Sequence, residues 1–234
     1  MHETIRRGRG TRKTVDVLRV FVATLWVLAG GILTTTSLVL GSATSWAESV
    51  AIKNHSFEAG GKVVDGGWTK SISGWTQRDR SKGAMGIWNP KGSQTGCGAS
   101  EKFMKGIPDG DRVAFSNGGT LSQRTNTTIT KGRSYTLTVG VGGRCNDRGG
   151  KYAIRLVTGN TSLATTTGTN PKGGWTEVTV TYSSPANDPH AGKPLTVRLE
   201  NQGRKQVDFD NVRMEVAKYK SIKTVLLGDL SIIG

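Results

Sequence analysis

The sequence predicts an all-β domain of the jelly-roll β-sandwich class, placed after an N-terminal export segment. Three observations predict this class. Apolar and polar residues alternate with period two in several short runs, glycine-rich turns separate the runs, and no stretch has a convincing helical period. Many short strands joined by regular turns are typical of sandwiches and jelly rolls.

The alternation is clearest in four runs, at 135–141, 152–156, 178–182 and 195–199. Residues that tolerate positive φ separate these runs and are expected to form the turns: Asn117-Gly118-Gly119, Lys131-Gly132, Gly142-Gly143, Gly159-Asn160 and Gly173-Gly174. Residues 60–105 are rich in Gly, Trp and charge, so long loops with short strands are expected there.

Residues 1–47 have the features of an export segment. A basic leader precedes residues 20–40, which carry no charge, and Ser45 and Ala47 supply the small residues of a cleavage site. This order is typical of a signal peptide. An uncleaved membrane anchor is the alternative, because about 20 apolar residues can span a bilayer. Either case predicts a secreted, periplasmic or cell-surface protein.

The remaining chain divides into a domain at 48–217 and an apolar tail at 218–234, which is too short to span a membrane. The formal net charge is +15, and the leader holds six basic and two acidic residues, which leaves +11 for the rest. Such an excess attracts acidic polysaccharide, anionic lipid or nucleic acid. Export argues against nucleic acid, and membrane contact is expected only through an uncleaved N-terminal segment. A scattered, solvated basic surface is the alternative.

The chain has two cysteines, Cys97 and Cys145, both in glycine-rich segments. In an oxidising compartment a disulfide between them would close a long loop and stabilise the fold by about 4 kcal/mol. Two free thiols are the alternative. The spacing does not match a zinc site.

Two carboxylates near the chain end are expected to lie in an unusual environment. Alternation places Asp208 and Asp210 on the same face as Val212, Met214 and Val216. If that face is the core, two like charges are buried together, which is costly without compensation. A calcium ion with oxygen ligands would compensate. The alternative is a bend or bulge that turns one aspartate outward.

The two ends of the domain resemble those of family 4/9-type carbohydrate-binding modules. The segments that carry the resemblance are Asn54-His55-Ser56-Phe57-Glu58, Ile72-Ser73-Gly74-Trp75, 109–119, 132–137 and Asp208-Phe209-Asp210-Asn211-Val212. The resemblance covers 50–216 and implies a galactose-binding-like jelly roll whose first and last strands meet at a structural calcium. It further implies that Glu58 and Asp210 are side-chain ligands, with backbone oxygens near Ser56 completing the site.

The tryptophans are candidates for ligand binding, because an indole packs against the C–H face of a sugar ring. Trp68 and Trp88 are expected on exposed loops, Trp175 follows Gly173-Gly174, and Trp75 is expected in the core. Plain packing is the alternative for each. The candidate polar partners of a bound ligand are Arg78, Arg80, Asn89 and Gln123. Cations among aromatic residues favour binding of an acidic glycan. The alternative is that these charged side chains only keep the loops soluble.

These observations favour an exported, non-catalytic carbohydrate-binding domain that is stabilised by Ca²⁺. A second resemblance, to the Stig cyclases of hapalindole-type biosynthesis, implies a terpenoid cyclase with Asp208 as general acid. It rests on the segment 113–118, where Phe115 stands in place of an expected tyrosine. A structural surface or matrix protein is the third alternative. No serine–histidine–acid arrangement and no phosphate-binding glycine motif is visible.

Overall fold

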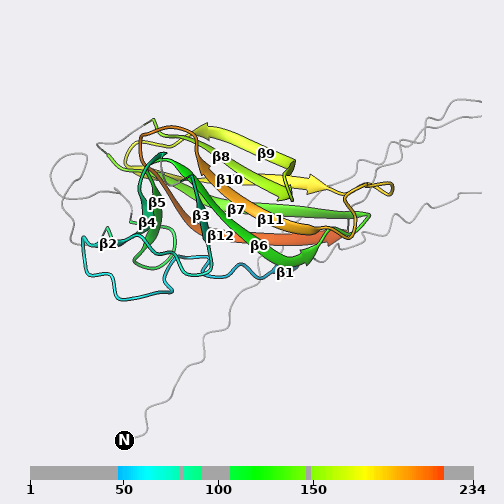
Figure 1. The fold of residues 1–234 in the computed structure, drawn as a ribbon, viewed down its shortest axis with the longest axis horizontal. Coiled ribbons are helices and arrows are strands. Elements are labelled where there is room, and N and C mark those ends of the chain that lie inside the picture. Colours follow the sequence, from blue (N-terminus) through cyan, green and yellow to red (C-terminus); the bar gives the residue numbers. More distant parts are fainter. Residues whose placement is uncertain (1–46, 80–81, 91–105, 146–148, 219–234) are drawn as a thin grey trace, which may run out of the picture. The chain divides into compact units, whose positions relative to one another are not determined.

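The computed structural model describes residues 47–79, 82–90, 106–145 and 149–218. Within these ranges the strands pair antiparallel in two sheets, and no α-helix is present (Figure 1). The predicted all-β sandwich is therefore confirmed. The export segment up to residue 46, Arg80, Cys97 and the tail beyond Lys218 lie outside the described residues. None of the described segments is a helix long and apolar enough to cross a membrane.

The larger sheet, called sheet A, contains seven strands of the described chain. In spatial order they are β10 (Gly174–Ser183), β7 (Arg133–Gly143), β12 (Val207–Lys218), β5 (Val113–Ser116), β4 (Met85–Trp88) and β2 (Trp68–Thr69), with β1 (Glu48–Val50) also paired to β12. The last long strand thus lies between β7 and β5. The first strand adds to its C-terminal half, with Val50 opposite Met214.

The second sheet, called sheet B, contains five strands in the described residues. Their order is β3 (Thr76–Arg78), β6 (Gly119–Thr128), β11 (Pro194–Asn201), β8 (Lys151–Thr158) and β9 (Thr161–Thr169). The predicted runs at 135–141, 178–182, 152–156 and 195–199 are confirmed as parts of β7, β10, β8 and β11.

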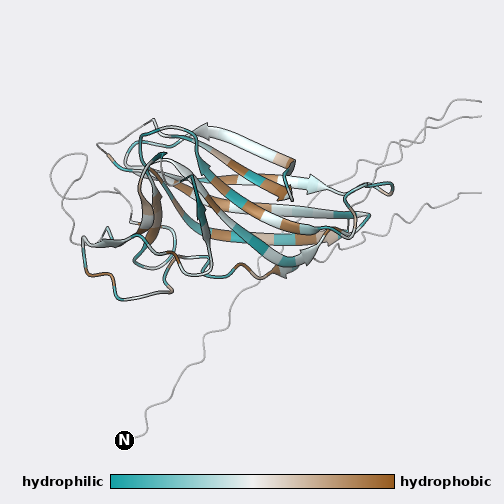
Figure 2. Cartoon of the chain, in the orientation of Figure 1, coloured by the Kyte–Doolittle hydropathy of each residue, from teal (hydrophilic) through white to brown (hydrophobic). Residues whose placement is uncertain are grey.

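The core lies between the two sheets and is filled by the apolar half of each alternating strand. Val139 and Val141 of β7 are fully buried, as are Leu156 of β8 and Val197 and Leu199 of β11. Figure 2 shows apolar and polar colours alternating along these strands. Burial of apolar area, at roughly 25 cal/mol per Å², is the main force that holds the sheets face to face.

Strand β12 corrects the predicted placement of the two aspartates. Its pairing with β7 shifts register between Asp210 and Arg213, and Asn211 has a positive φ of 48°. This bulge inserts one residue, so the side chains before and after it alternate in opposite phase. Val207 and Phe209 therefore face the core before the bulge, and Val212 faces it afterwards. Asp208 and Asp210 consequently lie on the opposite face of sheet A, not on the core face.

The predicted turn at Gly142-Gly143 is also wrong, because both residues belong to β7. Gly142 is a glycine for reasons of space. A Cβ atom there would lie 2.7 Å from the ring of Trp175, which is its cross-strand partner on β10. The glycine signal thus marks close packing of an indole rather than a change of chain direction.

Candidate functional site

The outer face of sheet A, at the end that holds β4 and β5, gathers aromatic and polar side chains. Asp208 is opposite Phe115 on β5 and opposite Gly142 on β7, and Gly142 is opposite Trp175 on β10. Directly opposed residues project to the same face of a sheet. Asp208, Phe115 and Trp175 therefore share the face that points away from the core.

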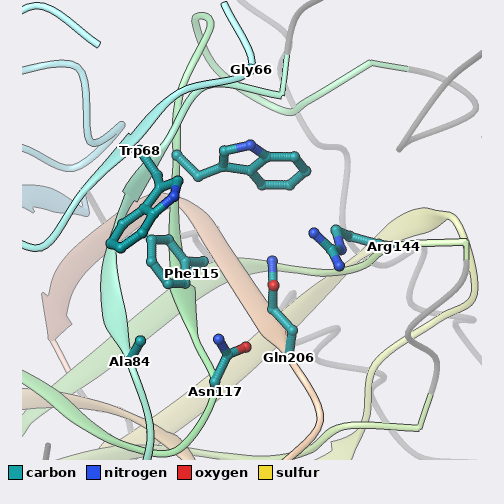
Figure 3. A pocket seen from close by; sticks show the side chains of 8 residues that line it. Gly66, Trp68, Ala84, Phe115, Asn117, Arg144 and Gln206 are labelled. Atoms are coloured by element: carbon teal, nitrogen blue, oxygen red, sulfur yellow. The ribbon is translucent and has the colours of Figure 1, made fainter. Parts of the chain in front are cut away.

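A hollow of about 250 Å³ opens on this face. Figure 3 shows Trp68 and Phe115 along one side, Arg144 across from them, and Asn117 and Gln206 along the edge between. The residues that line it are Gly66, Trp68, Ala84, Trp88, Phe115, Asn117, Arg144 and Gln206. Its volume lies just below the range of about 300–1,000 Å³ that is common for ligand sites, so a compact ligand fits it better than an extended chain.

Aromatic rings form most of the apolar wall. Trp68 is 56% exposed and meets the Phe115 ring edge to face at 5.8 Å between centroids. Trp88, the cross-strand partner of Trp68, is buried and packs with Val113 and Phe115, against which Trp175 also lies. The exposed indole of Trp68 and the buried ring of Phe115 that it contacts leave an aromatic surface open to a flat ligand.

Arg144 supplies the positive charge of the hollow. Its guanidinium carbon lies 5.4 Å from the centroid of the Trp88 ring, a cation–π arrangement. Its Nε atom is buried and has no hydrogen-bond partner within the part of the chain that the structure describes. A buried donor without a partner is costly in free energy.

Asp208 adjoins the hollow through two of its lining residues, Phe115 and Gln206. Its side chain is fully buried, and its Oδ1 accepts a hydrogen bond of 2.6 Å from Nε2 of Gln206. Gln206 itself lines the hollow and lies two residues earlier, just before β12 begins at Val207. The arrangement connects a buried carboxyl group to the ligand space through one amide.

The predicted metal ligands Glu58 and Asp210 lie at the same loop, at 109–112. Glu58 Oε1 accepts hydrogen bonds from the backbone N–H groups of Asp111 and Arg112, at 2.8 and 2.6 Å. Asp210 Oδ2 accepts one of 2.8 Å from the backbone N–H of Asp109. The structure therefore brings together two residues that are 152 positions apart in the printed sequence.

The charge of this loop cluster suits a cation. Burial raises the pKa of Asp210 to about 8; backbone N–H donors lower it, and the charges of Asp109 and Glu58 add to the rise. The Nε atom of Arg112 lies 3.7 Å from a carboxylate oxygen of Glu58 and offsets part of the charge of Glu58. Among the described residues, however, no three His, Cys, Asp or Glu side chains come together as a metal-binding group. A calcium ion here would need main-chain oxygens as well, such as those predicted near Ser56.

Two predicted ligand-binding amides belong to the framework instead. Gln123 is buried and ties down the main chain of Lys53, accepting from its N–H at 2.7 Å and donating to its carbonyl at 2.8 Å. Asn89 is buried and donates to the carbonyl of Val63 and to the carboxylate of Asp65. Their polar atoms are committed to the fold, so neither amide faces the hollow.

The other candidates separate in space. Trp68 and Trp88 line the hollow and Trp175 packs beside it, whereas Arg78 lies on the outer face of sheet B. Trp75 is in the core, as predicted. Cys145 is disulfide-bonded, and the other cysteine in the sequence, Cys97, lies outside the described residues.

Gln206 and Asn117 are lining residues that sequence reasoning did not find. For Gln206 the only signal was its position two residues before Asp208, and it precedes β12, which begins at Val207. For Asn117 no signal was usable, because the turn that contains it gave no information on which sheet face it borders.

The fold and the hollow define a β-sandwich protein with a hollow of aromatic and polar side chains on the outer face of one sheet. The model of the HpiC1-like family, described as HpiC1 cyclase, matches residues 48–215. Because this match covers more than half of the chain, the protein belongs to the HpiC1-like cyclase family.

Solved structures agree with this assignment. The chain is similar to a Stig cyclase, Fisc from Fischerella sp. TAU, in complex with (3Z)-3-(1-methyl-2-pyrrolidinylidene)-3H-indole: 25% identity, TM-score 0.64, covering 75% of this chain and 100% of that one. A cyclase from Fischerella sp. TAU in complex with 4-(1H-indol-3-yl)butan-2-one has 24% sequence identity and a TM-score of 0.63. The match covers 74% of this chain and 100% of that one. A family 4 carbohydrate-binding module is more distant, at 16% identity and TM-score 0.40, covering 71% of this chain and 99% of that one. No curated protein matches.

Proposed function

We propose that this protein is a cyclase that acts on a small indole-bearing substrate in the hollow of sheet A. The observation that carries the proposal is the family match over 48–215 combined with the position of Asp208, whose strand neighbour Phe115 lines that hollow. The two Fischerella cyclases hold indole compounds, which supports an indole ligand here. This function was the alternative in the sequence analysis, and it is now better supported than non-catalytic carbohydrate binding.

The shape and lining of the hollow support a flat aromatic ligand. An indole placed against Trp68 and Phe115 would gain the offset or edge contacts that aromatic pairs prefer, worth about 0.5–1.5 kcal/mol beyond area burial. The guanidinium of Arg144, which lines the hollow, would donate to an acceptor group on the substrate. A hollow of about 250 Å³ is of the size that suits a compact ligand.

Asp208 would act as the general acid. In its protonated form it transfers a proton to an alkene carbon of the substrate, which leaves a carbocation. An indole ring carbon attacks the cation and forms the new C–C bond, and loss of a proton from that carbon to the Asp208 carboxylate restores the acid. Aromatic faces beside the cation lower its energy, as cation–π contacts do.

Gln206 would position this acid. Its Nε2 donates to Asp208 Oδ1, so the carboxyl proton is directed to Oδ2. Phe115 provides no hydroxyl at the position where the cyclase resemblance expects tyrosine, and the polar side chains Asn117 and Gln206 border the hollow instead. Orientation of a proton donor by a hydrogen-bonded neighbour is a common feature of general acid catalysis.

We also propose that calcium binds at the loop cluster, held by Glu58 and Asp210 with main-chain oxygens. The support is electrostatic, because a cation would offset the charges that raise the pKa of Asp210. When bound, the ion would join the start of the domain to β12. Its contribution would be stability of the folded state, and the proton transfer would remain with Asp208.

The test is turnover of an indole–isonitrile terpenoid by the full chain in calcium buffer, followed by mass spectrometry of the isomeric products. Asp208→Asn is expected to reduce turnover by at least about a hundredfold, the lower end of what a general acid contributes. Asp79→Asn is the matched control, since Asp79 is exposed and does not line the hollow. Absence of turnover by the wild-type protein, or full activity of a folded Asp208→Asn variant, would contradict the proposal.

A further inference from the structure

The outer face of sheet B carries a row of basic and hydroxyl side chains. On β6, Ser122 and Arg124 alternate with the core residue Leu121, and on β11 Thr196 and Arg198 alternate with buried Val197. Strand β3 continues this face, because Thr76 is opposite Ser122. Period-two alternation therefore places these polar side chains together on the face turned away from the core.

Three arginines share one hollow on this face. Arg78, Arg124 and Arg198 line a space of about 360 Å³, together with Thr76, Ser122 and Thr196. No ion pair joins any of the three to a carboxylate within the described residues. The neighbouring Arg155 on β8 differs, since its Nε lies 3.0 Å from Glu200. The positive charge is thus neutralised on β8 and left uncompensated on β3, β6 and β11.

The register sets the spacing of the three charges. Arg198 on β11 is opposite Ser122 of β6, and Arg124 lies two residues after Ser122 on β6. Arg78 on β3 is opposite Thr120, which lies two residues before Ser122. With strands about 4.8 Å apart and about 6.7 Å between alternate residues, the three Cα atoms form a triangle with sides of roughly 8, 12 and 14 Å. Such spacing suits charges repeated along a chain better than a single anion.

We propose that this face of sheet B binds an acidic polysaccharide through its sulfate or carboxylate groups. Guanidinium groups bind these anions bidentately, and the flanking hydroxyls suit a sugar chain. A second copy of the protein would bring arginines against arginines in a symmetric contact, which is unfavourable. Nucleic acid is disfavoured because no aromatic side chain lines the hollow for base stacking.

The site is independent of the proposed cyclase site, because the two hollows lie on different sheets and share no lining residue. Loss of glycan binding would leave turnover unchanged, and loss of Asp208 would leave glycan binding unchanged. The results of the two experiments can therefore be told apart.

The test measures the affinity of the full chain for dextran sulfate, polygalacturonate and neutral dextran by biolayer interferometry. Arg78→Gln with Arg124→Gln is expected to weaken binding to an acidic chain by about tenfold or more, which is about 1.4 kcal/mol. Neither arginine has a side-chain bond that the fold requires among the described residues. The matched control is Lys62→Gln with Lys131→Gln, which removes the same charge from exposed positions elsewhere and is expected to change affinity by less than about twofold.

Wild-type binding to an acidic polymer, absent for neutral dextran and lost in the arginine variant alone, supports the proposal. An equal loss in both variants would show that net charge alone drives binding and would overturn it. Equally tight binding of a DNA duplex through the same arginines would also overturn it, as would no binding to either acidic polymer at low salt.

Discussion

At the scale of single residues, buried amides hold the framework on which the hollow is built. Asn170 is the clearest case. Its Oδ1 accepts from the N–H groups of Gly149 and Gly150, and its Nδ2 donates to the carbonyls of Gly142 and Gln206. One side chain thus satisfies four main-chain groups beside the site. A buried amide that makes all four of its bonds stabilises mainly by preventing unsatisfied polar groups.

Asn170→Ala is therefore expected to destabilise the protein strongly. Each buried main-chain group left without a partner costs about 1–3 kcal/mol, and partial relaxation suggests a total of about 3 kcal/mol. Urea unfolding measures the change in free energy. Asn126→Ala is the control, because Asn126 is exposed on β6 and should change stability by less than about 0.5 kcal/mol. Equal stability of the two variants would show that the Asn170 bonds are dispensable.

At the scale of the element, strand β12 does two jobs because it is bulged. Before the bulge it places Asp208 beside Phe115, which lines the hollow, and Asp210 at the loop cluster, and after it Val212 and Met214 enter the core. Without the extra residue, one of these two sets would lie on the wrong face. The bulge is positioned by Asn211, a residue type that tolerates positive φ better than most.

The bulge predicts different outcomes for three changes at position 211. Asn211→Gly should retain stability to within about 1 kcal/mol, because glycine adopts positive φ without strain. Asn211→Val should cost about 1–2 kcal/mol or more, since a β-branched residue is strained there. Deletion of Asn211 should abolish the folded state. Thermal melting followed by circular dichroism measures all three, and a stable deletion variant would refute this role of the bulge.

At the scale of the whole molecule, the loop cluster is expected to couple stability to pH and, with the proposed metal site, to calcium. In the metal-free protein burial raises the pKa of Asp210 to about 8, so the native state binds a proton that the unfolded state has released. Between the ordinary carboxyl pKa, near 4, and pH 8, stability therefore falls as pH rises. A bound calcium ion would reverse this preference, because it favours the ionised carboxylate.

The melting temperature in chelator should accordingly decrease between pH 5 and pH 8. One carboxyl contributes at most about 1.4 kcal/mol per pH unit, and each kcal/mol corresponds to roughly 2–4 °C for a domain of this size. Calcium added at pH 8 should restore the loss. Asp210→Asn should remove both effects, because asparagine does not titrate and is a weaker ligand. A melting temperature that responds neither to pH nor to calcium would exclude this coupling.

Much of the fold follows from local patterns. Strands form at residues 135–141 and 195–199, where apolar and polar residues alternate along the sequence and every second side chain is buried. Strand β9 escaped prediction, since its run of threonines and small residues has no apolar face to mark. In the site, Trp68 and Trp88 were found because large aromatics stand out in a glycine-rich segment, but both lie on short strands rather than loops, and Trp88 is buried rather than exposed. The framework roles of Gln123 and Asn89 could not be seen without the segments that they bind.

The sequence by itself determined an all-β sandwich with a basic surface, a resemblance to cyclases and carbohydrate-binding modules, and the residues most worth examining. Only the tertiary structure decided which face of β12 carries Asp208 and Asp210. The physical reason is that alternation records relative, not absolute, orientation, and one inserted residue at Asn211 inverts the phase. Pairing between strands that are distant in the chain then placed Asp208 beside Phe115 and left Arg78, Arg124 and Arg198 on the opposite sheet.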